Sequence, residues 1–397
     1  MLGWELPPHN SGGLGVACYH MSKALAAQGA TIDFIVPYAA EQQISHMNVY
    51  AAVSAPPGRQ YVGAYDHGQS VAGDCDSLRH IRQLQHQYSA FVRQFVAQHR
   101  PDVIHAHDWL TIEAGIVAKQ LTGAPLIIHV HATEFDRSGE YRGSQLVHEI
   151  EQQGLLMADQ IIAVSHATKD VIVEKYHIPP EKVVVIYNAM NNLSLPSADR
   201  RNQTYRYLDD LRQNGYTIVG TLTRLTAQKG LRYFLEAAAL ALKQHDRLIF
   251  VLFGDGEQRD ELIQLSAQLG ISQRVLFAGF VRGVQWRDAY RVLDIFVMSS
   301  VSEPFGLTAL EAAHYDTALL ISKQSGVGEI LHNIMTFDYW DVQTLASDIV
   351  RIARSTDLRD SLQQQVKRES RRLSWYDAAA RCMRVYQACC RGEKEAS

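Results

Sequence analysis

The chain has 397 residues, a formal net charge of −4, 47% hydrophobic residues and 20% charged residues. This length suits two domains of ordinary size, and the composition is typical of a folded globular protein rather than a disordered one. The small negative charge argues against a general nucleic-acid binder, and no apolar run approaches the roughly 20 residues that a membrane-spanning helix needs.

The start of the chain and its cysteines indicate a cytoplasmic protein. Residues 1–5 (MLGWE) lack the basic start and apolar middle of a signal peptide. The five cysteines are scattered, odd in number and without metal-ligand spacing, which fits free thiols in a reducing compartment. Met1 is expected to fall inside an opening strand ahead of 32–36, so we expect a few upstream residues to be missing. Peripheral contact with a membrane stays open.

Short apolar, β-branched runs alternate with helix-length segments in the first half of the chain. One such helix covers 16–28 and is closed by Gly29 as its C-terminal cap. The alternation predicts a parallel sheet covered on both faces. The expected strands are 32–36, 103–107, 126–130, 160–164 and 183–186.

A second alternating series follows a stretch without periodicity, which we interpret as a linker at 191–204. Two doubly wound domains are therefore expected, 1–190 and 205–374, with a last helix in 375–397 that crosses back to the first domain. Ligands of such folds bind at the carboxyl ends of the strands, so the interdomain cleft is the expected site. The expected strands here are 217–222, 248–254, 275–279, 295–299 and 318–322.

The most informative motif is a pair of carboxylates, Glu303 and Glu311, on either side of a chain break at Pro304 and Gly306. Helical spacing resumes at Leu307, so the backbone N–H groups of Phe305, Gly306 and Leu307 would lie at a helix N-terminus. Unpaired donors and the helix dipole make that position an anion site. Two acids flanking it could hold hydroxyls on both sides of a diphosphate, which is the layout of a sugar nucleotide.

Two cations follow the first strand of the second series. Arg224 and Lys229 lie in the connection after 217–222, where both could reach a ligand. Expulsion of a nucleoside diphosphate builds negative charge on its β-phosphate, and cations there stabilise the transition state. Gly254, in a Gly-Asp-Gly turn after the next strand, would allow close backbone approach. Taken alone, this turn and the two basic residues are weak signals.

Taken together, these motifs resemble those of the retaining glycosyltransferases of the GT-B fold, the large family-4-like group that includes glycogen, starch and sucrose synthases. The resemblance is carried by Glu303 to Glu311, by Arg224…Lys229-Gly230 and by a Gly-Gly-Leu loop at 12–14. It implies that Gly12 and Gly13 lie over the donor diphosphate and that Gly254 lies near the nucleoside. The synthases usually carry a lysine just before the two glycines, and this chain does not, which argues against a close glycogen-synthase identity.

Histidines end two neighbouring strands, as His105-Ala-His107-Asp108-Trp109 and His129-Val-His131. They could suggest a metal site, but no Asp-x-Asp motif or cysteine partner supports one, and GT-B transfer needs no metal. The resemblance implies that His131 contacts the donor sugar and that Asp108 and Trp109 are supports on the acceptor side. His105 is interpreted as a core histidine.

The sequence therefore predicts a metal-independent, retaining transfer of a hexose from a nucleoside-diphosphate sugar to a hydroxyl of a sugar or glycan, with no cofactor and no nucleic-acid partner. Arg224 and Lys229 would stabilise the leaving diphosphate, Glu303 would hold sugar hydroxyls and Glu311 would bind ribose. The alternatives are glucan elongation specifically, a phosphorylase or epimerase of the same fold, and a non-catalytic sugar-nucleotide binding protein. A loop over 54–76 is either a surface loop or an acceptor-contacting one.

Overall fold

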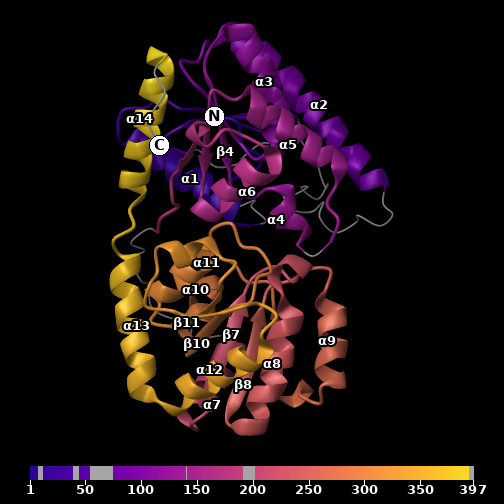
Figure 1. The fold of residues 1–397 in the computed structure, drawn as a ribbon, viewed down its shortest axis with the longest axis vertical. Helices are drawn as coiled ribbons and strands as arrows, with labels where there is room; N and C mark the ends of the chain where they lie inside the picture. Colours follow the sequence, from indigo (N-terminus) through magenta and orange to yellow (C-terminus); the bar gives the residue numbers. More distant parts are fainter. Residues whose placement is uncertain (8–11, 39–43, 54–74, 140, 191–201, 393–397) are drawn as a thin grey trace. The chain divides into compact units, whose positions relative to one another are not determined.

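The computed structural model describes residues 1–7, 12–38, 44–53, 75–139, 141–190 and 202–392. The chain forms two compact units (Figure 1). Unit 1 comprises Met1–Ala189 together with Ser374–Ser397, and unit 2 comprises Met190–Leu373. The predicted loop at 54–76 lies outside the described residues up to residue 74. Most of the predicted linker at 191–204 lies outside them as well. The next helix begins at Gln203, inside the predicted linker.

Unit 1 is built on parallel strands. One group is ordered β3-β4-β5-β6, and a separate pair joins β1 to β2. Leu2 links the two groups, because it forms single bridges to Ile35 in β1 and to Ala106 in β3. The strands are β1 (Asp33–Val36), β2 (Asn48–Ala51), β3 (Ile104–His107), β4 (Leu126–Val130), β5 (Gln160–Ala163) and β6 (Val183–Val185).

The helices of unit 1 follow the expected alternation with strands. The first helix begins at Gly13, three residues before the predicted start. Its end is as expected: Gly29 has φ +93°, and the N–H groups of Gly29 and Ala30 donate to the carbonyls of Ala26 and Leu25, the bonds of a Schellman cap. The helices are α1 (Gly13–Ala26), α2 (Cys75–Gln98), α3 (Trp109–Thr122), α4 (Glu134–Ser138), α5 (Gln145–Met157), α6 (His166–Tyr176) and α14 (Trp375–Arg391), with a short 3-10 turn at Pro180–Lys182.

The C-terminal helix α14 packs on unit 1, although it follows unit 2 in the sequence. It lies along α1, where the Gln28 side-chain amide donates to the carbonyl of Tyr376 at 2.6 Å. Cys382 of α14 is fully buried, and its sulfur is 3.8 Å from that of Met21 in α1. The chain therefore returns to the sheet of its first half after completing unit 2.

Unit 2 is a six-stranded parallel sheet in the order β12-β11-β10-β7-β8-β9. Successive strands are added outward on one side from β7 to β9 and on the other side from β10 to β12, so the order reverses between β7 and β10. In doubly wound sheets this reversal is where ligands bind. The strands are β7 (Thr217–Leu222), β8 (Leu248–Phe253), β9 (Val275–Gly279), β10 (Ile295–Met298), β11 (Ala318–Ser322) and β12 (Met335–Phe337).

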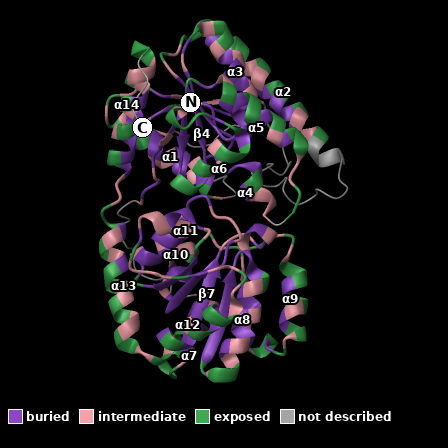
Figure 2. Ribbon diagram, viewed as in Figure 1, coloured by how far each residue is buried: buried purple, intermediate pink, exposed green. Residues whose placement is uncertain are grey.

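Helices cover the sheet of unit 2, and its apolar strands form the core. Phe234 of α8, Phe250 of β8 and Val297 of β10 are fully buried in one cluster. Figure 2 shows the strands as buried and the outward faces of α9 and α13 as largely exposed. The helices are α7 (Gln203–Gln213), α8 (Leu231–Gln244), α9 (Arg259–Gln268), α10 (Val284–Arg291), α11 (Leu307–His314), α12 (Val342–Arg354) and α13 (Thr356–Ser370), with short 3-10 turns at Ala227–Lys229, Ser272–Arg274 and Gly326–Glu329.

The ten strands expected from 32–36 onward are all present, each within one residue of its predicted ends. The strand expected at Met1 is wrong, because only Leu2 pairs there, through two isolated bridges. Two further strands, β2 and β12, were not expected because they are short and only partly buried, so they lack the continuous apolar run that marks the others. In the described part of the chain, no helix combines the length and the apolar character needed to cross a bilayer.

Candidate functional site

The loops after β7 and β10 meet at the reversal point of the unit 2 sheet. Lys229 lies at the end of the short 3-10 turn after β7, and its Nζ is 2.6 Å from Oε2 of Glu303 in the loop after β10. Both side chains are largely buried, at 12% and 15% exposed. The Ser300 hydroxyl donates to the same carboxylate oxygen at 3.2 Å. The structure thus brings together two of the predicted catalytic side chains.

Backbone contacts fix the position of this ion pair. The Glu303 N–H donates to Gln324 at 3.0 Å, and its carbonyl accepts from Gly326 at 2.9 Å. On the other side, the Ser299 hydroxyl donates to the carbonyl of Lys229 at 3.0 Å. Gly230 has φ +60°, and a Cβ there would lie 2.1 Å from the carbonyl oxygen of Ser299. Only glycine lets the chain after Lys229 approach the end of β10 this closely.

Helix α11 begins directly after the Glu303 loop, as expected. Gly306 is its N-terminal cap at φ +106°, and Phe305 is buried beneath it. The first amides of a helix have no acceptor within the helix, so the N-terminus of α11 can donate to an anion. Glu311 lies one turn further along α11, and its Oε2 accepts from the hydroxyl of Tyr290 at 2.7 Å.

The environment of Glu311 is unusual for a carboxylate. Burial raises its pKa from 4.5 to about 8, and the hydrogen bond from Tyr290 opposes this shift only in part. Tyr290 is itself fully buried and stacks on Tyr315, with ring centroids 5.8 Å apart. At neutral pH the Glu311 carboxyl of the ligand-free protein is therefore mostly protonated. A ligand that donates hydrogen bonds to it would favour the ionised form, so the proton would be released on binding.

Arg224 and Gly254 lie in neighbouring loops. A Cβ at Gly254 would be 1.8 Å from the carbonyl oxygen of Thr223, and one at Gly256 would be 2.5 Å from that of Leu225. The Gly-Asp-Gly turn is thus pressed against the backbone on both sides of Arg224. This packing accounts for the two glycines without any ligand, so the role of Gly254 near a nucleoside stays a prediction.

The predicted phosphate loop of unit 1 is described only in part, since Asn10 and Ser11 lie outside the described residues. Gly12 caps α1 in an extended conformation, φ −169°, and Gly13 is the first helical residue and is exposed. The loop therefore leads into a helix N-terminus, as the sequence indicates. The described geometry does not by itself require glycine at position 12.

The histidines at the ends of β3 and β4 are buried together. His131 Nε2 is 3.0 Å from His107 Nδ1, and His105 Nδ1 is 2.5 Å from the hydroxyl of Tyr386 in α14. Burial lowers the pKa of His131 to about 3 and lowers those of His105, His107 and His129 as well. All four rings are therefore neutral at physiological pH.

The arrangement of these rings bears on whether they could bind a metal ion. Two triplets in the described residues bring ligand atoms within 4.8 Å of one another, Cys18 with His107 and His131, and His105 with His107 and His129. However, in the second triplet the rings of His105 and His107 stack at 4.3 Å and 25°. In the first triplet His107 Nδ1 and His131 Nε2 are 3.0 Å apart, a hydrogen-bond distance. A metal binds along the in-plane lone pair of each imidazole, whereas stacked rings present their faces to each other. The absence of a metal site stays a prediction.

Asp108 and Trp109 are both buried, at 5% and 3% exposed, and their role as supports on the acceptor side stays a prediction. Asp108 has φ +56°, a strained conformation for a residue with a Cβ. Although it precedes α3, its carboxylate does not cap that helix; Oδ1 accepts instead from the N–H groups of His131 at 2.6 Å and Ala132 at 3.3 Å. Burial raises the pKa of Asp108 to about 7.

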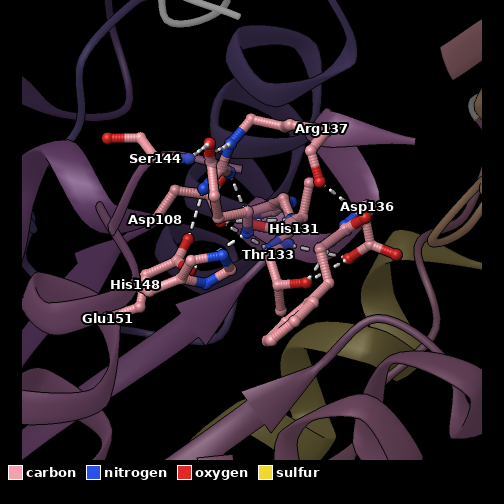
Figure 3. A network of polar contacts seen from close by, with 12 residues as sticks. Asp108, His131, Thr133, Asp136, Arg137, Ser144, His148 and Glu151 are labelled. Atoms are coloured by element: carbon pink, nitrogen blue, oxygen red, sulfur yellow. Dashed lines mark hydrogen bonds and ion pairs between the residues drawn. The ribbon is translucent and has the colours of Figure 1, made fainter. Parts of the chain in front are cut away.

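Sequence reasoning missed three residues that hold the site, namely Tyr290 beside Glu311, and Arg137 and Glu151 beside the His131 turn (Figure 3). A local signal existed for the turn, because Thr133 and Asp136 form a capping box at the start of α4. No spacing rule links Tyr290 to Glu311 or Arg137 to Glu151, since each pair joins different helices.

Two family models match the chain. The model described as Glycosyltransferase Family 4 covers residues 11–192, and the model described as Glycosyl transferases group 1 covers residues 209–369. An uncharacterized glycosyltransferase of Methanocaldococcus jannaschii is 28% identical, with 98% of this chain and 97% of that protein aligned. A glycogen synthase of Mycobacterium tuberculosis is 27% identical, with 100% of this chain and 95% of that protein aligned.

Solved structures share the fold along nearly the whole chain. The sucrose-phosphate synthase of Thermosynechococcus elongatus superposes with a TM-score of 0.80 at 18% identity, covering 99% of this chain and 98% of its own. HepE of Anabaena, solved in complex with UDP and glucose, gives 0.72 at 20% identity over 98% of both chains. The fold is therefore GT-B. With both halves matched by the family models, the chain belongs to the family-4 glycosyltransferases, which transfer sugars with retention of configuration.

Proposed function

We propose that the protein transfers a hexose from a nucleoside-diphosphate sugar to a hydroxyl of a sugar or glycan, without a metal. The observation that carries this proposal is the buried Lys229–Glu303 pair at the sheet reversal, three residues before the N-terminus of α11. A cation, a helix N-terminus and a carboxylate grouped in this way suit a diphosphate joined to a polyol. The thiols of Cys18 and Cys390, which are in no disulfide, fit a cytoplasmic setting for the reaction.

The donor diphosphate is assigned to Arg224, Lys229 and the amides of residues 305–307. As the bond from the anomeric carbon to the phosphate oxygen breaks, the leaving diphosphate takes the electron pair, and these donors stabilise its growing charge. The acceptor oxygen bonds to the same face of the anomeric carbon, and its proton passes to the leaving phosphate oxygen. No side chain acts as a nucleophile in this scheme.

The remaining predicted residues are assigned to recognition. Glu303 would exchange part of its pairing with Lys229 for hydrogen bonds from sugar hydroxyls, and Glu311 would accept from the ribose. On unit 1, His131 is assigned to the sugar, and its neutral ring can accept or donate one hydrogen bond. Gly12, Gly13 and Gly254 remain assigned to the donor diphosphate and nucleoside, and Asp108 and Trp109 remain supports.

Glucan elongation is the second candidate, favoured by the His-Asp-Trp element at 107–109 and by similarity to a glycogen synthase. The lack of a lysine before Gly12 weighs against it. UDP-glucose is the first donor to test, because the structurally similar HepE was solved with it. ADP- and GDP-linked hexoses complete the panel.

The test is donor consumption in the presence and absence of acceptors, using wild type and Glu303→Gln. The proposal expects release of nucleoside diphosphate that depends on a sugar or glycan acceptor and falls by about 100-fold or more in the variant. Consumption that needs inorganic phosphate instead would indicate a phosphorylase, and an altered donor sugar without acceptor would indicate an epimerase. Donor binding with no turnover would indicate a binding protein.

A further inference from the structure

The turn that carries His131 is held in an unusual way. Four consecutive backbone N–H groups, at residues 131–134 after β4, all donate to side-chain carboxylates rather than to other backbone groups. The four contacts are His131 and Ala132 to Asp108, at 2.6 and 3.3 Å, Thr133 to Asp136 at 2.8 Å, and Glu134 to Glu151 at 3.0 Å. Figure 3 shows these side chains gathered around the turn, with Asp108 from the residue before α3, Asp136 from α4 and Glu151 from α5.

Arg137 is the cation of this network. Its Nη1 donates to the carbonyl of Ala132 at 2.7 Å, its Nε donates to Glu134 at 3.2 Å, and its Nη2 donates to Glu151. The Arg137 and Glu151 side chains are only 7% and 6% exposed. The neighbouring carboxylates raise the pKa of Arg137 further, so it stays charged. One guanidinium thus links the Ala132 carbonyl of the turn to Glu151, the carboxylate that accepts from the Glu134 N–H.

A buried ion network of this kind is weak evidence for stability, because desolvation of the charges offsets most of their attraction. Its geometry is nevertheless specific, since the planar guanidinium donates in fixed directions to three acceptors at once. Its only backbone acceptor in these contacts is Ala132, the residue after His131. The His131 ring is held separately by His107 at 3.0 Å, so both the backbone and the ring of His131 have fixed partners.

We propose that Arg137 and Glu151 are positioning residues, which act through the 131–134 turn to hold the His131 imidazole in place for the donor sugar. This inference rests on the role assigned to His131 in the proposed function. Neither residue needs to touch the substrate. A small displacement of a positioned group can lower the rate by up to about 100-fold, because the reaction depends on alignment.

The experiment compares Arg137→Lys and Glu151→Gln with a matched control, Arg82→Lys. Arg82 forms a two-bond pair with Glu113 in the same unit, at 2.6 and 3.0 Å, but contacts no part of the 131–134 turn in the described structure. We expect kcat to fall about 10- to 100-fold in the two network variants with the donor KM changed less than about threefold, and the control to keep both constants. Glu151→Gln removes the charge but keeps the shape of the side chain. It therefore tests the network even if Arg137→Lys fails to fold.

A double-mutant cycle with His131→Ala shows whether the network acts through His131. The inference expects Arg137→Lys to cause no further loss of kcat in the His131→Ala background, since coupled residues are not additive. The same fold loss in both backgrounds would overturn it, as would failure of both network variants to fold, because the network would then serve stability alone. If His131→Ala keeps wild-type kcat while transfer persists, the assigned role of His131 fails but the transferase function stands.

Discussion

Glu311 gives the sharpest test of how the donor is bound, because its ionisation is coupled to the ligand. Its pKa in the free protein is about 8, raised by burial. If ribose hydroxyls donate to the ionised carboxylate, binding must first remove the proton at lower pH. The apparent donor affinity then rises with pH and levels off above the pKa. From pH 7.0 to 8.5 the expected tightening is about eightfold, since each unit below the pKa costs about 1.36 kcal/mol.

The assay is isothermal titration of a non-hydrolysable donor analogue or of the nucleoside diphosphate, at several pH values and in two buffers of different ionisation enthalpy. At pH 7 the free carboxyl is about 90% protonated, so binding should release about 0.9 proton. Glu311→Gln should bind weakly at every pH and release no proton from this site. Tyr290→Phe removes the hydrogen bond that lowers the pKa, so its affinity profile should shift to higher pH.

The free energy of unfolding should change with pH in the opposite direction to the donor affinity, which gives a second test of the Glu311 assignment. Between the unfolded pKa of 4.5 and the folded pKa of about 8, the native state holds a proton on Glu311 that the unfolded state has lost. This group therefore favours folding at low pH and loses that contribution as pH rises through 8. The ligand effect and the stability effect should both vanish in Glu311→Gln. An affinity that is independent of pH, or an equal slope in Glu311→Gln, would refute the assignment.

Three further outcomes are expected. Gly230→Ala should lower kcat/KM at least tenfold, because its Cβ would lie 2.1 Å from the carbonyl oxygen of Ser299. The control is Gly270→Ala, which is also at positive φ but has no atom within 4 Å of the added Cβ. It should lower the free energy of unfolding by only about 1–2 kcal/mol and leave kcat and KM unchanged. Lys229→Met should lower kcat about 100- to 1,000-fold by removing a cation from the leaving diphosphate, measured with saturating donor. Removal of metal ions with a chelator should leave the transfer rate unchanged, and a rate restored only by added metal would contradict the metal-independent scheme.

The sequence was sufficient for most of the fold because the signals are local. Runs such as 126–130 and 217–222 are rich in apolar and β-branched residues, and they become strands with those bounds. Gly29 and Gly306 mark a helix end and a helix start as expected, and both adopt positive φ. The strand β2 was not predicted because Asn48 is exposed and the other three residues are only partly buried, so their pattern does not differ from that of a loop.

The site was predictable only where one motif contained it. Glu303 and the start of α11 lie in a single segment. The family resemblance assigned Lys229 to the same donor site, and in the structure its Nζ is 2.6 Å from Oε2 of Glu303. The partners of Glu311 and of the His131 turn come from other helices, with Tyr290 in α10 and Glu151 in α5. Such contacts depend on tertiary packing, which no periodicity in the chain records.

The most direct test of the central claim is the anomeric configuration of the product. Wild-type protein, an α-linked nucleoside-diphosphate hexose such as UDP-glucose and a panel of sugar acceptors would be followed by proton NMR, with the nucleoside diphosphate quantified in the same tube. The account predicts an α-linked glycoside formed in equal amount to the released nucleoside diphosphate, and none without acceptor. A β-linked product, or loss of donor with no glycoside formed, would contradict it.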